Sequence, residues 1–139
     1  MIEAYTKNQS CATGSNVAFN NVTIEKGCTA VLQTPTTIAL NKCGVYMVSV
    51  DAYGAVSGSV AGAVTLQLAR DGVLQPQAIS GASSSGTADS VAVSFQTLVQ
   101  VEQNNCRCNC CTSPTVLTVQ NVGSPATLTS ANIVVTKVC

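Results

Sequence analysis

The residues of this chain best suited to chemistry are its eight cysteines. Half of them form a cluster six residues long: Cys106, Cys108, Cys110 and Cys111. The others are isolated in the sequence: Cys11, Cys28, Cys43 and Cys139. Thiols in such number can form disulfides, bind a soft metal ion as thiolates, or stay reduced.

Structural disulfides, within or between subunits, are the favoured interpretation, and all eight cysteines are candidates. Neighbours within the cluster pair poorly with one another. An i,i+2 pair in an extended chain lies near the ~6.8 Å limit on Cα separation, and a vicinal Cys110–Cys111 bridge would be strained. We therefore expect bridges that join the cluster to the isolated cysteines.

Two other interpretations of the thiols stay open. The spacing of Cys106, Cys108, Cys110 and Cys111 is similar to that of metallothionein-like clusters, so a thiolate metal site is one alternative. Ordinary zinc sites, however, use C-x₂₋₄-C pairs, and the chain offers no histidine. The second alternative is free thiols kept reduced in a cytosol.

No pattern typical of catalysis accompanies the cysteines. The absence of histidine excludes Ser-His-Asp and Cys-His mechanisms. The carboxylates are scattered, and their spacing does not predict a catalytic pair: Glu3, Glu25, Asp51, Asp71, Asp89 and Glu102. We expect a non-enzymatic protein with no catalytic residue and no cofactor.

Charge is sparse and balanced. The chain has six basic and six acidic residues, zero net charge and 9% charged residues, against about 25% in ordinary domains. Capture of nucleic acid or of an anionic membrane needs clustered Lys and Arg, so we expect neither as a partner. The start, residues 1–7, lacks the basic and apolar regions of a secretory signal. We expect either no export by that route or a leader already removed.

Apolar residues recur with a period of two, which predicts β-strands. The clearest run is 91–101, and similar strands are expected over 44–53, 64–70, 115–121 and 132–138. Asp71-Gly72 predicts a hairpin. The returning strand over 73–79 contains Pro76, so we expect it to be short or at a sheet edge, followed by a flexible loop over 80–86. Shorter strands are expected over 17–25, 29–33 and 36–40.

These elements predict an all-β chain of about eight to ten short antiparallel strands with no helix. So many strands must stack as two sheets or close into a barrel to bury their apolar faces. With 139 residues the chain fits one domain. We expect residues 1–15 to form an N-terminal arm and residues 16–139 to form the single domain.

Strand parity gathers most cysteines at one end of such a sandwich. Consecutive antiparallel strands run in opposite directions, so their connections alternate between the two ends. Counting from Cys43 places Cys28, Cys139 and the whole of the cluster at the same end. Cys11 is left unassigned by this count.

The order of these segments resembles the C1q/TNF-like jelly-roll superfamily. The similarity is carried by Ile38–Val50, by 64–72 and 90–101, and by the closing pair 117–121 and 131–137. The chain is particularly similar to bacterial and phage members of the superfamily, which decorate virions or form the heads of collagen-like spore-surface proteins. Members of the superfamily are usually compact homotrimers without enzymatic activity. The resemblance therefore implies an antiparallel two-sheet jelly-roll sandwich and a homotrimer.

From this resemblance we expect a trimeric structural or display protein on a virion surface, as a capsid decoration or head-fibre component. The alternative is an adhesin or ligand-binding head on a bacterial cell or spore surface, and a thiolate metal-binding protein ranks lower. The partners implied are further copies of the chain, a phage capsid protein or a host-surface glycan. Apolar residues on outward strand faces are the candidates for the trimer interface: Met47, Tyr53 and Leu98.

Overall fold

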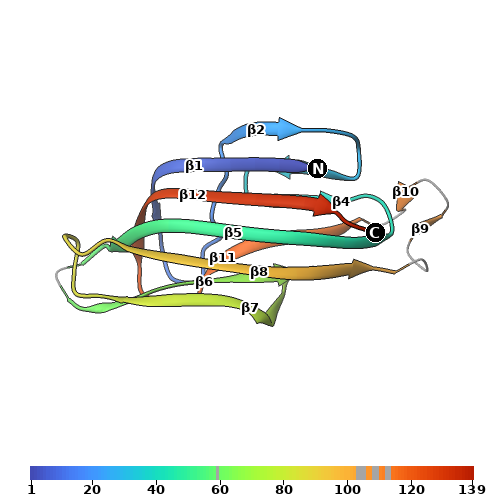
Figure 1. Ribbon diagram of the computed structural model, residues 1–139. Coiled ribbons are helices and arrows are strands. Elements are labelled where there is room, and N and C mark those ends of the chain that lie inside the picture. Colours follow the sequence, from blue (N-terminus) through green and yellow to red (C-terminus); the bar gives the residue numbers. More distant parts are fainter. Residues whose placement is uncertain (59, 103–105, 108–109, 112–113) are drawn as a thin grey trace.

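Two five-stranded antiparallel sheets pack face to face in the computed structural model (Figure 1). It describes residues 1–58, 60–102, 106–107, 110–111 and 114–139. The first sheet has the order β2-β1-β12-β5-β8, and the second has the order β3-β4-β11-β6-β7. None of the described residues is helical. The predicted all-β, two-sheet antiparallel jelly roll is confirmed.

The strands of the first sheet are β1 (Ile2–Cys11), β2 (Asn21–Glu25), β5 (Gly44–Val56), β8 (Val91–Val101) and β12 (Ala126–Lys137). Those of the second sheet are β3 (Ala30–Thr34), β4 (Thr37–Leu40), β6 (Gly62–Arg70), β7 (Val73–Ser84) and β11 (Thr115–Asn121). A separate short pair consists of β9 (Cys106–Arg107) and β10 (Cys110–Cys111).

Alternating side chains build one core between the sheets. Successive residues of a strand point to opposite faces, so every second side chain is buried. On β5 these are Tyr46, Val48, Val50 and Ala52, an alternation that agrees with the strand predicted over 44–53. On β8, which has the predicted bounds, the even-numbered positions are exposed and the odd ones face inward. The opposite faces of β1, β5, β8 and β12 form what we call the outer face of the first sheet.

The predicted hairpin joins β6 to β7. Asp71 and Gly72 have φ angles of 51° and 82°, and a two-residue type I′ turn requires positive φ at both positions. Asp71 also ties the turn to β11, because its Oδ1 accepts a hydrogen bond from the Val116 amide at 2.9 Å. The Asp71 amide donates in return to the Val116 carbonyl at 2.8 Å.

Strand β7 corrects part of the prediction. It lies at the edge of the second sheet, as expected, but it continues to Ser84, so residues 80–84 are not a loop. Pairing with β6 decides this, since Gly62 lies opposite Ser84 and Thr65 opposite Gly81. Pro76 falls where the β6–β7 register shifts, a place that a residue without an amide proton can occupy.

The first residues also differ from the expectation. Residues 1–15 were expected to be an arm outside the domain, yet β1 lies between β2 and β12 in the first sheet. Ile2 and Ala4 on β1 are completely buried. The expected strand over 17–25 begins only at Asn21, because Val17 and Phe19 enter the core from an irregular segment. Strand β12 starts at Ala126, earlier than the predicted 132.

Candidate functional site

The outer face of the first sheet carries the three predicted interface residues. Met47 on β5 and Leu98 on β8 are register partners, and Leu98 is 61% exposed. They line a hollow of about 510 Å³ together with Gln96 and Thr97. The Gln96 Nε2 lies 3.2 Å from the Met47 sulfur and donates to it. Leu98 is thus an apolar side chain beside a shallow depression rather than part of a packed core.

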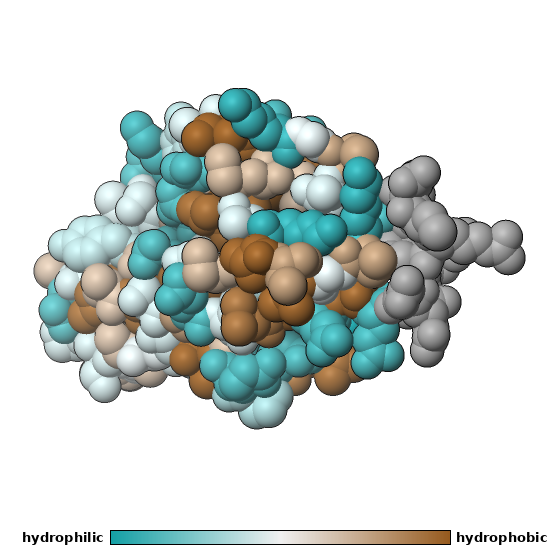
Figure 2. All heavy atoms as spheres, turned by 45° about the vertical axis from the view of Figure 1, so that its right-hand side comes forward, coloured by the Kyte–Doolittle hydropathy of each residue, from teal (hydrophilic) through white to brown (hydrophobic). Residues whose placement is uncertain are grey.

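Tyr53 lies further along β5, in a second hollow of about 360 Å³. Its lining mixes apolar surface with charged and polar groups, including Lys7, Asp51 and Asn132. Asn132 Nδ2 donates to the Glu3 carboxylate at 3.3 Å across β1 and β12. The outer face therefore has a half around Met47 whose hollow has no charged residue in its described lining and a half around Tyr53 that Lys7 and Asp51 line. Figure 2 views this face obliquely and shows hydrophobic residues (brown) gathered in the middle, with hydrophilic residues around them.

A second apolar surface was missed by the sequence reasoning. Strand β7, at the edge of the second sheet, exposes Val73, Leu74 and Ile79, which are 65%, 38% and 44% exposed. The strand was expected to be short or at a sheet edge, but these three residues were not identified as an exposed apolar surface. The signal in the sequence was the presence of three large apolar residues in a strand interrupted by proline.

The cysteine pole is the end of the sandwich that holds Cys28, Cys43, Cys139 and the β9–β10 pair (Figure 1). The strand-parity prediction is confirmed for these three residues and for Cys106, Cys110 and Cys111, whose backbone forms β9 and β10. Cys108 lies outside the described residues. Cys28, Cys43 and Cys139 are free thiols in the structure.

Cys11 lies at the opposite end, where it pairs with Ala126 at the start of β12. It is 4% exposed, and its sulfur donates to the Ser15 carbonyl at 3.5 Å. Burial raises the pKa of the Cys11 thiol. A buried thiol at this distance from the cysteine pole behaves as a small core residue, so we expect no bridge to it.

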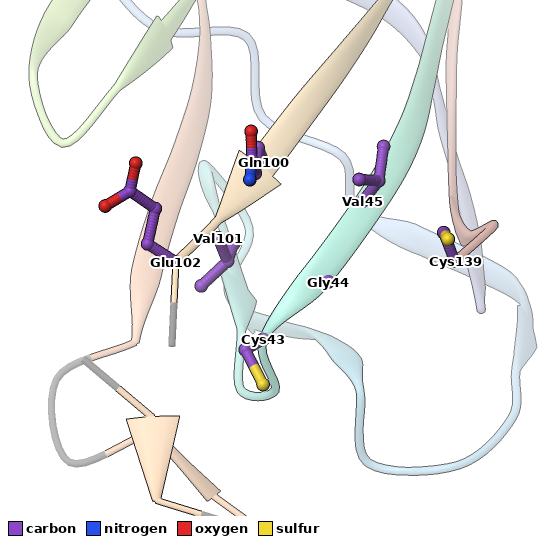
Figure 3. A pocket seen from close by; sticks show the side chains of 7 residues that line it. All are labelled: Cys43, Gly44, Val45, Gln100, Val101, Glu102 and Cys139. Carbon is purple, nitrogen blue, oxygen red and sulfur yellow. The ribbon is translucent and has the colours of Figure 1, made fainter. Parts of the chain in front are cut away.

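A hollow of about 540 Å³ opens at the cysteine pole between the start of β5 and the end of β8 (Figure 3). Its lining includes Cys43, Gly44, Glu102 and Cys139. The sulfur atoms of Cys43 and Cys139 lie on opposite sides of Gly44 and do not point toward one another. Gly44 has a φ of 139°, and a Cβ at this position would clash with the Cys139 carbonyl. The end of the chain therefore lies directly against the backbone of β5.

Tyr46 connects two loops of the cysteine pole from inside the core. Its side chain is fully buried, and its hydroxyl lies 2.6 Å from the Lys42 carbonyl and 3.3 Å from the Thr29 carbonyl. Burial raises the pKa of the Tyr46 phenol, and negative charge on Cys43 or Cys28 would raise it further. The period of two over residues 44–53 does not predict these two hydrogen bonds.

Comparison with known proteins identifies the fold. No family model and no curated protein matches the sequence. Among solved structures, murine APRIL at pH 5.0 is similar with a TM-score of 0.64 and 10% identity, covering 99% of this chain and 98% of that one. Eiger TNF from S. frugiperda gives 0.59 and 14%, covering 99% and 92%. Rabbit GITRL gives 0.51 and 7%, covering 100% and 95%. The chain has a TNF-like jelly-roll fold.

The TNF-like fold confirms the resemblance drawn from the sequence at the level of architecture. Within this fold, the described lining of the hollow at the cysteine pole offers one carboxylate side chain, Glu102, and two thiols that face apart. Among the described residues, no group of three or more Cys, Asp or Glu side chains is placed to hold a metal ion. The side chains of Cys106, Cys108, Cys110 and Cys111 lie outside that description, so a thiolate site in the cluster stays a prediction. The described part of the chain also holds no helix with the length and apolarity to cross a membrane.

Proposed function

We propose that this chain is a non-enzymatic structural and display domain that works as a homotrimer. The observation that carries the proposal is the presence of two separate apolar surfaces on one TNF-like subunit. One is the hollow beside Met47 and Leu98 on the outer face, and the other is the edge strand β7 with Val73, Leu74 and Ile79. Contacts between unlike surfaces of identical subunits close into a ring when the rotation permits.

The superfamily resemblance implies that the ring closes with three subunits. Sparse charge supports burial of the outer face, because charged residues are depleted in the cores of protein interfaces. The charged residues at outward positions of β1, β5 and β8 are Glu3, Lys7 and Asp51, and Lys7 and Asp51 line the hollow around Tyr53. The hollow around Met47 can therefore be covered without burying an unpaired charge.

We further propose that the trimer decorates a phage virion, as a capsid decoration or head-fibre component. The support is the resemblance of the segments to phage members of the superfamily and the neutral, Thr- and Ser-rich composition, with 16 Thr, 14 Ser and zero net charge. A neutral, polar surface suits a protein that is displayed at high density, because neighbouring copies do not repel one another. The partner would be a capsid protein, with a host-surface glycan as the target of display.

Two measurements test these proposals separately. Light scattering on the purified chain should give a mass near three times 14.1 kDa, and a monomer at micromolar concentration would overturn the trimer. An antibody against the chain should label purified phage particles from the source culture. Label confined to a bacterial cell or spore envelope would overturn the virion role and favour the adhesin alternative, while leaving the trimer intact.

A further inference from the structure

The hollow beside Tyr53 is a trough that crosses three neighbouring strands of the first sheet. Strands β1, β12 and β5 lie side by side (Figure 1), and three consecutive residues of each strand line this hollow of about 360 Å³. The middle residues of the three runs are Thr6, Ala131 and Ala52, which are register partners with buried side chains. Their backbone therefore forms the floor of the trough.

Outward side chains form a wall on each side of this floor. Each wall is a row of register partners: Tyr5, Asn132 and Asp51 in one, and Lys7, Ser130 and Tyr53 in the other. The walls are two residues apart along each strand, which is about 7 Å, and each wall extends over two strand spacings, which is about 10 Å. The volume lies in the range of small-molecule sites, ~300–1,000 Å³.

Two irregularities of the backbone adjoin the wall that ends in Tyr53. Thr129 is an extra residue on β12, because the β12–β5 register shifts beside Ser130. On β1, Asn8 follows Lys7 with a φ of 51°, a positive value that residues other than glycine rarely adopt. A bulge bends its strand and re-aims the side chains beside it, and bulges are common next to functional sites. The bend accounts for a hollow on a sheet face that is otherwise regular.

Each end of the trough combines an aromatic ring with a charge. Tyr5 and Lys7 belong to the β1 end, and Asp51 and Tyr53 belong to the β5 end. Tyr53 is 47% exposed, and Lys7 and Asp51 are exposed too. These two are the charged residues of the described lining, and their charges cancel. The trough therefore suits a ligand without net charge.

The polar groups of the trough include both hydrogen-bond donors and acceptors. The Asn132 Nδ2 donates to the Glu3 carboxylate at 3.3 Å, which leaves the amide oxygen of Asn132 to accept a hydrogen bond. The Ser130 hydroxyl can donate or accept, the Asp51 carboxylate accepts and the Lys7 ammonium donates. Hydroxyl groups of a ligand can satisfy all of these, because each hydroxyl both donates and accepts. An apolar ligand would leave the same groups desolvated and unpaired.

We propose that this trough binds a neutral glycan, with one sugar ring packed on Tyr5 and the next on Tyr53. The C–H face of a sugar ring packs against an aromatic ring, while the sugar hydroxyls bond to the polar groups between the two tyrosines. A phosphate-bearing ligand gains little here, because Asp51 offsets the one lysine. The inference rests on the display role proposed above, for which it names the site that meets a host-surface glycan.

A second subunit is the competing occupant of the trough, since Tyr53 was also a candidate for the trimer interface. Covering the trough with protein would take Lys7 and Asp51 out of water, which is costly unless each gains a partner of opposite charge. The hollow beside Met47 has no charged residue in its described lining and can be covered without that cost. The trimer contact and the glycan site can therefore share the outer face.

Tyrosine fluorescence reports directly on the trough. The chain has three tyrosines and no tryptophan, and the tyrosine outside the trough, Tyr46, is buried in the core. The full chain is titrated with maltose, cellobiose, lactose and chitobiose, and with sorbitol as a control that carries hydroxyls but no ring. We expect a saturable change in emission with at least one disaccharide and none with sorbitol. An equal change with sorbitol, or no saturable change with any of the four disaccharides, would overturn the proposal.

Variants measured by titration calorimetry locate the binding. Tyr53→Ala should weaken the affinity for the bound disaccharide about tenfold, and Asp51→Asn should weaken it as well. Tyr46→Phe is the matched control, because it changes a tyrosine outside the trough and should leave the affinity unchanged. An unchanged affinity in Tyr53→Ala, with a mass from light scattering that falls below three subunits, would assign the trough to a second subunit instead.

Leu98→Glu separates this inference from the trimer. The variant alters the outer face outside the trough, so it should bind the disaccharide with the affinity of the wild type whatever its mass. A wild-type trimer that ignores all four disaccharides would overturn the glycan site and leave the trimer standing. A wild-type monomer that binds one of them through Tyr53 would do the reverse.

Discussion

Met47 on β5 and Leu98 on β8 lie directly opposite each other on the outer face of the first sheet. Met47 is half-buried by its neighbours, whereas Leu98 is 61% exposed although it lies on a regular central stretch of its strand. Methionine adapts its shape to irregular contacts, and an exposed leucine beside it is available to a partner surface. This pair is therefore a point on the outer face at which a second subunit would gain apolar contact.

The first prediction concerns this pair. Leu98→Glu places a charge in the contact, so the mass from light scattering should fall from three subunits toward one at the same concentration. Val60→Glu is the control, since Val60 is 78% exposed but lies in the β5–β6 loop. That variant should remain trimeric. A Leu98→Glu chain that stays trimeric down to nanomolar concentration would exclude this half of the outer face from the interface.

The second prediction concerns the close approach of the chain end to β5. Gly44→Ala adds a Cβ against the Cys139 carbonyl and the Lys137 side chain, at a φ of 139° that other residues rarely adopt. We expect a loss of about 2–4 kcal/mol in the free energy of unfolding, measured with urea. Gly58→Ala is the matched control, because its Cβ would meet its nearest described atom at 3.7 Å. Equal stability of the two variants would show that the end of β12 does not dock as described.

The third prediction concerns Asn121, which is 1% exposed at the end opposite the cysteine pole. Its side-chain nitrogen donates to the carbonyls of Cys11 and Ser124, both at 3.0 Å, and its oxygen accepts from the Gly123 amide at 3.0 Å. Asn121→Ala removes these bonds and leaves a buried carbonyl unpaired, so thermal unfolding should show a loss of about 2–4 kcal/mol. Asn132→Ala, which removes one bond of 3.3 Å on the half-buried outer face, should cost less than about 1 kcal/mol.

The fourth prediction concerns alkaline stability. Burial raises the pKa of Tyr46, so the folded chain keeps a proton that the unfolded chain releases above its ordinary pKa of about 10. The Tyr46 contribution to stability is therefore constant below pH ~10 and falls as the pH rises through the folded pKa. With a reductant present, wild type should lose more free energy of unfolding than Tyr46→Phe between about pH 9 and 11. Tyr53→Phe, at an exposed position, should follow wild type.

Local sequence patterns predicted much of the fold because a strand with one buried face has an apolar residue at every second position. The strand over 91–101 was predicted with the bounds of β8, and Asp71-Gly72 with the turn that it forms. The failures have a common cause. Residues 80–84 are small (Ser, Gly and Ala), and only pairing with β6 makes them a strand. Strand β1 depends on partners as distant in the sequence as β12.

The sequence by itself determined the strand periodicity, the absence of histidine chemistry and, through strand parity, the gathering of cysteines at one end. The first two follow from the types and spacing of the residues. The third follows from the opposite directions of consecutive antiparallel strands, which do not depend on how side chains pack. The tertiary structure decided which side chains meet. It placed Leu98 opposite Met47, turned Cys139 away from Cys43, and brought the Cys28 loop to the Cys43 loop through Tyr46. Such contacts depend on the register between distant strands, which is set by burial of the whole core rather than by any segment alone.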